Sequence, residues 1–289
     1  MVIKNAIPVQ SLPMTEEAIA TLYPDPDEHQ EDRQMLASVI KVFSGVKNSR
    51  KYTFFIEKQA QEKFLKHVND IYKKCGHEAT GLFVGYYLHN EDDESRKVAV
   101  ATDFLPSFGS SSAVTCEIGY EDAARNAHYC QTHRVLPLAQ GHTHPFPGHV
   151  PCFSSVDFDT HRSKFAAPHQ MAFVCNNLSN KYTGYKMNDG EPCHESIYCV
   201  DLKESLKTGD LVSECLYEAT PQAKEAPAKV GGQKAPVKAP RQSNKVKTLL
   251  YVILIMQIIQ FAMILFPYIM SFGLIRILIT DSFMGLLKI

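Results

Sequence analysis

Two hydrophobic patterns alternate along the middle of the chain, one typical of buried strands and one typical of an amphipathic helix. Phe64, Val68 and Ile71 recur at helical spacing and predict a helix over 58–74, and a second helix is expected over 119–134. Runs rich in β-branched and aromatic residues predict strands at 52–58, 81–88, 97–105, 135–144, 171–177, 181–188 and 195–202. Interleaved strands and helices predict a mixed α/β domain over 51–217.

The segments on either side of this domain have different patterns. Residues 1–50 predict a largely flexible N-terminal arm, because the stretch 21–32 is rich in acids and proline and has no apolar period, although the apolar patch 36–43 leaves open a helix docked on the domain. Residues 218–247 contain Ala, Pro and Lys but few large apolar side chains, so we expect a disordered basic linker. Residues 249–266 carry no charge, which predicts a transmembrane helix within a membrane segment at 248–289.

Two arrangements of the tail stay open. One is a single span; in the other the chain kinks at Pro267 and residues 268–289 lie along the membrane interface, with Arg276 outside the hydrocarbon. Lys245 and Lys247 precede the apolar segment and favour a cytoplasmic position for the linker and the domain. The sequence therefore predicts a C-terminally membrane-anchored protein whose domain faces the cytoplasm.

Charge and cysteine content narrow the classes of partner and compartment. The formal net charge is −1, but residues 219–247 carry seven Lys/Arg and one Glu, so the basic charge is concentrated in the linker. Without a basic field over the domain, nucleic acid is not expected as a partner. The eight cysteines are scattered, form no CxxC pair and follow no secretory leader, which favours reduced thiols over a disulfide framework.

The stretch 142–161 carries the candidate chemistry. His142 and His144 are separated by one residue, a spacing that sends both side chains to the same face of a strand. Asp157 follows where Ser154 could open a helix, and it adds a carboxylate to the two imidazoles. Three such protein ligands with a fourth position left open are typical of a catalytic zinc site.

A general base is the remaining requirement for such a site. Glu78 lies just before the predicted strand 81–88. The segment is not the HExxH helix of many zinc proteases, because position 81 is glycine. Spacing alone favours a surface carboxylate at Glu78.

Taken together, these segments resemble the JAMM (MPN+) metalloprotease pattern, in which a glutamate precedes a G-Φ-Φ-x-G strand and H-x-H and S-x-x-D follow. Here the elements are Glu78 with Gly81–Gly85, His142-Thr-His144, and Ser154-Ser-Val-Asp157. The sequence of these motifs is most similar to that of the AMSH type of deubiquitinase, and the resemblance covers about 51–202. It implies a JAMM/MPN, cytidine-deaminase-like mixed sheet flanked by helices.

The resemblance also implies an activity. Zinc would be held by His142, His144 and Asp157, Glu78 would act as general acid and base, and Ser154 would donate a hydrogen bond to the oxyanion. The reaction implied is hydrolysis of the isopeptide bond between ubiquitin, or a ubiquitin-like protein, and a lysine. With the apolar tail, the expected protein is a membrane-tethered deubiquitinase acting on such conjugates.

Two departures from the pattern matter. Nine residues separate His144 from Ser154, where the family usually has seven, and the inserted loop brings in His149 as a candidate substrate contact, with a solvated loop histidine as the alternative. AMSH-type enzymes hold a second, structural zinc through a histidine two residues after the catalytic aspartate. Asp159 stands there, and Cys193 and His194 do not match the remaining spacing. We therefore expect one zinc per chain and no second site.

Two other functions remain as alternatives. One is a peptidase of the same fold that processes the C-terminus of a prokaryotic ubiquitin-like or sulfur-carrier protein, as in a defence system. The other, of a different class, is a catalytically silent MPN scaffold that only binds partners. Such scaffolds lose the zinc ligands, whereas this chain keeps all three ligands and the glutamate.

Overall fold

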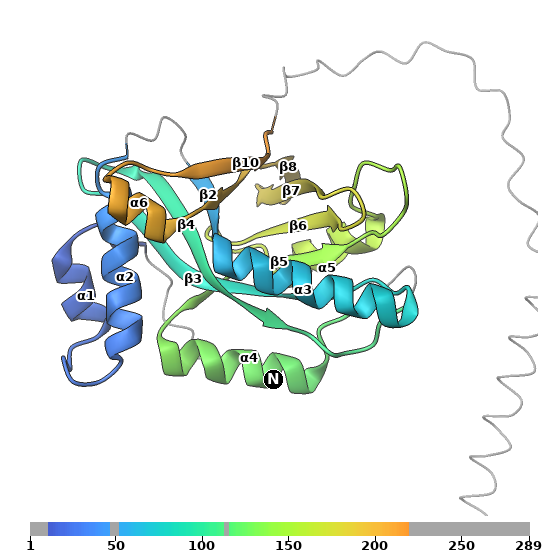
Figure 1. Ribbon diagram of the computed structural model, residues 1–289, viewed down its shortest axis with the longest axis horizontal. Coiled ribbons are helices and arrows are strands. Elements are labelled where there is room, and N and C mark those ends of the chain that lie inside the picture. The colour runs from blue at the N-terminus through green and yellow to red at the C-terminus, as the bar shows by residue number, and fades with distance from the viewer. Residues whose placement is uncertain (1–10, 47–51, 113–115, 220–289) are drawn as a thin grey trace, which may run out of the picture. The chain divides into compact units, whose positions relative to one another are not determined.

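The computed structural model describes residues 11–46, 52–112 and 116–219, which belong to one compact unit (Figure 1). Its strands are β1 (Leu12–Pro13), β2 (Tyr52–Glu57), β3 (Thr80–Asn90), β4 (Asp93–Pro106), β5 (Leu136–Thr143), β6 (Met171–Asn176), β7 (Lys181–Asn188), β8 (Glu191–His194), β9 (Ile197–Val200) and β10 (Ser213–Tyr217). Its helices are α1 (Glu16–Leu22), α2 (Gln30–Phe43), α3 (Lys58–Cys75), α4 (Tyr120–His133), α5 (Ser155–Lys164) and α6 (Leu202–Thr208).

The strands form one mixed sheet in the order β10-β9-β2-β4-β3-β5-β6-β7-β8, with β1 paired to β3 outside this path. The pairs β2/β4, β2/β9 and β5/β6 are parallel, and β3 is antiparallel to both β4 and β5. The sheet is curled, so that its two end strands lie next to each other. The side chain of Tyr217 on β10 is hydrogen-bonded to that of His194 on β8 at 2.6 Å. The expected mixed α/β domain with helices flanking the sheet is confirmed, whereas β8, β10 and α6 were not predicted.

Helix α3 lies against the concave face of this curled sheet (Figure 1). It begins where the Glu57 carboxylate accepts hydrogen bonds from two backbone N–H groups of the first turn. It ends at Gly76, whose φ of +69° is the left-handed conformation that glycine adopts without strain. Phe64 contacts the rings of Phe83, Phe104 and Phe173 at centroid distances of 5.3–5.5 Å, so one helix residue joins strands β3, β4 and β6.

The N-terminal helices are a correction to the expected arm. Residues 16–22 and 30–43 are helical and pack on the outer face of the sheet, so a largely flexible segment is wrong for residues 11–46. The alternative, a docked helix over 36–43, is confirmed. Polar contacts add to the apolar packing: the hydroxyl of Tyr23 donates to the His133 carbonyl at 2.6 Å, and Asp32 pairs with His133 at 3.0 Å. The composition of this segment did not indicate helices, because a few apolar residues at helical spacing are enough to stabilise a helix that packs on an exposed apolar sheet face.

Two glycines of the G-Φ-Φ-x-G segment are required by close strand packing. A Cβ on Gly81 would lie 2.3 Å from the Phe104 ring, and one on Gly85 would lie 2.1 Å from the carbonyl of Val100. The β3/β4 register shifts between Val84 and Gly85, so the second glycine lies at an irregularity of the ladder. Both glycines therefore allow β3 to lie close to its neighbour.

The predicted membrane segment at 248–289 lies outside the described residues, as does the linker from residue 220 onward. Among the helices of residues 11–46, 52–112 and 116–219, none has both the length and the apolar character needed to cross a bilayer.

Candidate metal centre

Strand β5 positions both histidines in the middle of the sheet. It lies between β3 and β6, and His142 is opposite Thr80 on one side and Val174 on the other. His144 follows the last residue of the strand, and its backbone N–H still donates to the Cys175 carbonyl at 3.0 Å. The extended backbone therefore sends both imidazoles to the same face, as the one-residue spacing predicts.

Helix α5 brings the carboxylate to this face. Ser154 caps the helix: its hydroxyl oxygen accepts from the Asp157 N–H at 3.2 Å, and the Asp157 carboxylate accepts from the Ser154 N–H at 2.7 Å. The Ser154 hydroxyl also donates to Asp157 Oδ2 at 2.7 Å. This capping box fixes the helix start and orients the carboxylate toward β5.

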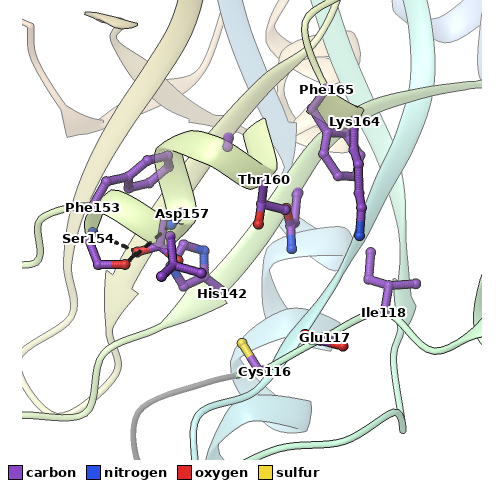
Figure 2. A pocket seen from close by; sticks show the side chains of 13 residues that line it. Cys116, Glu117, Ile118, His142, Phe153, Ser154, Asp157, Thr160, Lys164 and Phe165 are labelled. Carbon is purple, nitrogen blue, oxygen red and sulfur yellow. Dashed lines mark hydrogen bonds and ion pairs between the residues drawn. The ribbon is translucent and has the colours of Figure 1, made fainter. Parts of the chain in front are cut away.

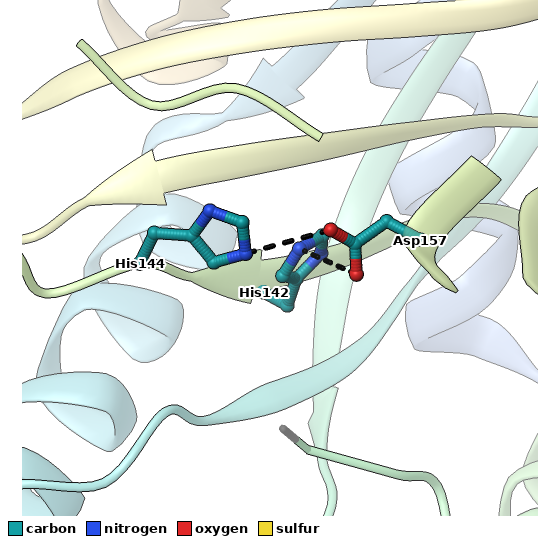
Figure 3. Close-up of side chains that lie close together, drawn as sticks. All are labelled: His142, His144 and Asp157. Atoms are coloured by element: carbon teal, nitrogen blue, oxygen red, sulfur yellow. Dashed lines mark ion pairs between the residues drawn. The ribbon is translucent and has the colours of Figure 1, made fainter. Parts of the chain in front are cut away.

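The three side chains form a compact ligand set (Figure 3). His142 Nε2 lies 3.4 Å from Asp157 Oδ1, and His144 Nε2 lies 3.5 Å from Asp157 Oδ2. One ligand atom from each of the three residues lies within 4.8 Å of the others. The buried Nε2 of His142 makes no hydrogen bond to any described residue. A buried ring nitrogen that makes no hydrogen bond is costly, and a divalent metal ion between it and Asp157 would satisfy it. The donor set therefore fits a metal ion.

Glu78 lies beside the ligand set rather than on the surface. The residue is only 3% exposed, and its carboxylate is 3.7 Å from His144 Nε2. The neighbouring Ala79 is tied to β5 twice, because its N–H donates to the Thr143 hydroxyl at 2.9 Å and its carbonyl accepts from the Thr143 N–H at 3.0 Å. Thr143, the residue between the two histidines, thus positions Glu78 against them.

The titration of these groups reflects burial and mutual charge. Burial raises the pKa of Glu78 to about 7, with Asp157 adding to the shift and His144 opposing it. Burial would also raise the pKa of Asp157, but the two imidazoles and Ser154 outweigh it and hold that pKa well below its usual range. Burial opposes a rise in the pKa of His144, yet Asp157 and Glu78 raise it. Strong shifts in opposite directions on adjacent carboxyls are typical of catalytic sites.

Two pockets adjoin this centre and share Cys116 and Glu117. The first, which we call the α5 pocket, has a volume of about 260 Å³ (Figure 2). Its walls include the following residues: Ile118, Gln140, His142, Phe153, Ser154, Val156, Asp157, Thr160, Lys164, Phe165 and Ala172. The second, the α3 pocket, has a volume of about 300 Å³. Its walls include the following residues: Ile71, Lys74, Cys75, Glu78, Ala79, Thr80, Ser107, Phe108, Gly109, Ser110 and Ser111.

The loop between His144 and Ser154 is held by buried side chains of β6 and β7. The Asn176 amide donates to the carbonyls of Phe146 and His149 at 2.8 and 2.9 Å, and Thr183 donates to the Pro151 carbonyl at 2.6 Å. The side chain of His149 is exposed and lines neither pocket. The structure therefore does not bring His149 to the metal ligands, and its role as a substrate contact stays a prediction.

Two of the three residues considered for a second zinc are bonded to other side chains. Asp159 pairs with Arg162 at 3.2 Å, and His194 is bonded to Tyr217. Cys193, on β8, has a free thiol. Within the residues that the structure describes, the group at His142 is the one cluster suited to a metal ion.

Sequence reasoning missed Thr143 and Asn176. The H-x-H spacing itself contained a signal for Thr143, since the middle residue must point to the opposite face of the strand. No local signal singles out Asn176, because its partners lie about thirty positions away along the chain.

No family model matches the chain, and no curated protein matches its sequence. Among solved structures, it is similar to protein DSY2949 from Desulfitobacterium hafniense, a solution structure. The two are 15% identical, the match covers 52% of this chain and 94% of that chain, and the TM-score is 0.38. What the chain does is therefore inferred from its own side chains.

Proposed function

We propose that this chain is a zinc-dependent isopeptidase of the JAMM/MPN+ type that releases ubiquitin or a ubiquitin-like protein from lysine. The observation that carries the proposal is the pairing of a buried glutamate with the His142, His144 and Asp157 ligand set. A ligand set alone would fit a structural ion. A buried carboxylate 3.7 Å from one ligand, with its pKa raised to about 7, adds the acid–base group that hydrolysis needs.

The three ligands would hold the zinc ion. When bound, zinc would act as a Lewis acid and lower the pKa of a coordinated water from 15.7 towards about 7. Glu78 accepts a proton from the attacking water and returns it to the leaving amine nitrogen, as the new C–O bond forms and the C–N bond breaks. Ser154 would turn its hydroxyl hydrogen from Asp157 to the oxyanion, a contribution of about 3 kcal/mol where such donors have been removed.

The resemblance of the sequence supports the finer fold, a cytidine-deaminase-like JAMM/MPN sheet, and the choice of zinc. The uncharged segment at 249–266 supports a membrane anchor, with the domain in the cytoplasm. Tethering would raise the local concentration of conjugates at the membrane surface.

The test is hydrolysis by the full chain, purified in detergent and loaded with zinc. Diubiquitins of each linkage and lysine conjugates of ubiquitin-like proteins serve as substrates, with and without a chelator. We expect at least one substrate to be cleaved, activity to stop with the chelator and to return with added zinc. Cleavage of none of them by zinc-loaded protein, or cleavage that survives chelation, would rule the proposal out.

A further inference from the structure

The two pockets beside the metal centre are lined by different members of the proposed catalytic group. Glu78 lines the α3 pocket, whereas Ser154 and Asp157 line the α5 pocket. Resting on the proposed function, we infer that the leaving lysine side chain occupies the α3 pocket and that the acyl chain of the modifier occupies the α5 pocket. The scissile bond then lies between them, beside Cys116 and Glu117, which line both.

Proton transfer fixes which pocket receives the amine. The acid that protonates the leaving nitrogen must come within about 2.6–3.2 Å of it, directly or through one water. Glu78 is 3% exposed and lines the α3 pocket, so a nitrogen at the mouth of this pocket can approach its carboxylate. In the orientation that we infer, the carbon chain attached to that nitrogen continues into the α3 pocket.

The walls of the α3 pocket suit the stem of a lysine. Ile71, Ala79 and Phe108 provide apolar surface for its methylene groups, which favour contact with hydrocarbon over water. Phe108 is 67% exposed, yet its ring contacts His67 at 5.4 Å and lies under Arg125 at 5.9 Å. The ring is therefore held beside the pocket by its neighbours while one face stays accessible to a bound hydrocarbon stem.

The α3 pocket is preformed around the general base. The Asp122 carboxylate accepts from the Phe108 N–H at 2.7 Å and from the Ser107 hydroxyl at 2.6 Å. The Ser107 N–H donates to the Thr80 carbonyl at 3.1 Å, two residues after Glu78. The wall that carries Phe108 is therefore bonded to the strand that follows the general base.

The acyl chain is left with the α5 pocket. Phe153, Val156 and Phe165 give it apolar walls, and Lys164 lies at its edge in Figure 2. Ser154 lines this pocket, so the carbonyl of an acyl chain bound there lies next to the proposed oxyanion donor.

The experiment compares two substrates that share an acyl group and differ in the amine. Both carry the modifier that the wild type releases in the functional test above. In one substrate it is joined to the lysine Nε of a short peptide, and the other is its C-terminal methylamide, which has no lysine stem. Values of kcat/KM come from intact mass, with the full zinc-loaded chain. The variants are Phe108→Ala for the α3 pocket, Val156→Ala for the α5 pocket and Leu178→Ala as an exposed apolar control that lines neither pocket.

We expect Phe108→Ala to lower the ratio of kcat/KM for the lysine substrate to that for the methylamide by about tenfold, the effect of losing an apolar contact in a pocket. Val156→Ala should lower both values together and leave the ratio unchanged, and Leu178→Ala should match the wild type. Cys75→Phe, which fills the α3 pocket from an exposed position, should lower the ratio without depending on a truncated side chain.

Each outcome has a distinct meaning. If the wild type releases no modifier in the functional test above, the proposed function is wrong and this inference falls with it. If the wild type cleaves both, but Phe108→Ala and Cys75→Phe leave the ratio unchanged, the function stands and the orientation is wrong. A change in the ratio with Val156→Ala alone would reverse the orientation.

Discussion

Replacing Asn176 by alanine tests whether the hydrogen bonds of this side chain fix the loop between His144 and Ser154, and with it the positions of the metal ligands. The Asn176 side chain is fully buried at the end of β6. It donates to the Phe146 and His149 carbonyls at 2.8 and 2.9 Å and accepts from the Leu178 N–H at 3.1 Å. Asn176→Ala removes these three bonds together.

The expected loss follows from those contacts. A typical internal hydrogen bond contributes about 0.5–1.5 kcal/mol net, and water can reach the freed carbonyls because Phe146 and His149 are exposed. We therefore expect Asn176→Ala to lower the free energy of unfolding by about 2–3 kcal/mol. The loop joins His144 to Ser154, so a loop without these bonds should also raise the Kd for zinc. We expect a rise of about tenfold, the lower end of the effect of removing residues that support metal ligands.

The neighbouring residue supplies the matched control. The Asn177 amide donates one hydrogen bond, to Asn69 Oδ1 at 3.0 Å, so Asn177→Ala should cost about 1 kcal/mol and leave zinc affinity unchanged. Stability is measured by urea unfolding with a chelator present, and zinc affinity by competition with a coloured chelator. The reasoning is refuted if the two variants unfold at the same urea concentration and bind zinc equally.

Three further predictions concern the metal, the base and acid stability. Wild-type protein should contain about one zinc per chain; Asp157→Ala should lose most of it and Asp159→Ala should keep it, with two zinc ions per chain contradicting the single site. Glu78→Gln should keep zinc but lose about 10²–10⁴-fold in kcat, and hydrolysis at the wild-type rate would show that another group is the base. Burial lowers the pKa of His169 from 6.5 to about 4, with Lys186 adding to the shift, so between these values the unfolded chain binds more protons than the folded one. The free energy of unfolding should therefore fall as the pH drops from 6.5 to 4, by up to about 1.4 kcal/mol per pH unit, and His169→Gln should flatten this dependence in acid titrations followed by circular dichroism.

Local sequence was enough to predict the elements that carry the ligands. Strong apolar runs and a helical period place β3, β5 and α3 within a few residues of the observed bounds. The spacing of His142 and His144, and of Ser154 and Asp157, is a local property of a strand and of a capped helix, so the ligand set could be proposed from spacing alone.

The position of Glu78 was decided by tertiary structure. Spacing favoured a surface carboxylate, yet the residue is buried beside His144. Its burial depends on antiparallel pairing between β3 and β5, whose residues Thr80 and His142 are more than sixty positions apart. No periodicity near residue 78 encodes that pairing.

The N-terminal helices and the pockets illustrate the same limit. The stretch 21–32 is rich in acids and proline, but Leu36, Val39 and Phe43 form a stripe that is stable only against an uncovered sheet face. Likewise, the α3 pocket lies between the end of α3 and the segment 107–111, which is held by a hydrogen bond from the Phe108 N–H to Asp122 of α4. The sequence by itself determined the strands and helices with strong periodic patterns, and the ligand types, because these depend on neighbours along the chain. The long-range strand pairing decided which side chains are buried together, and therefore where the base, the pockets and the supporting amide lie relative to the ligands.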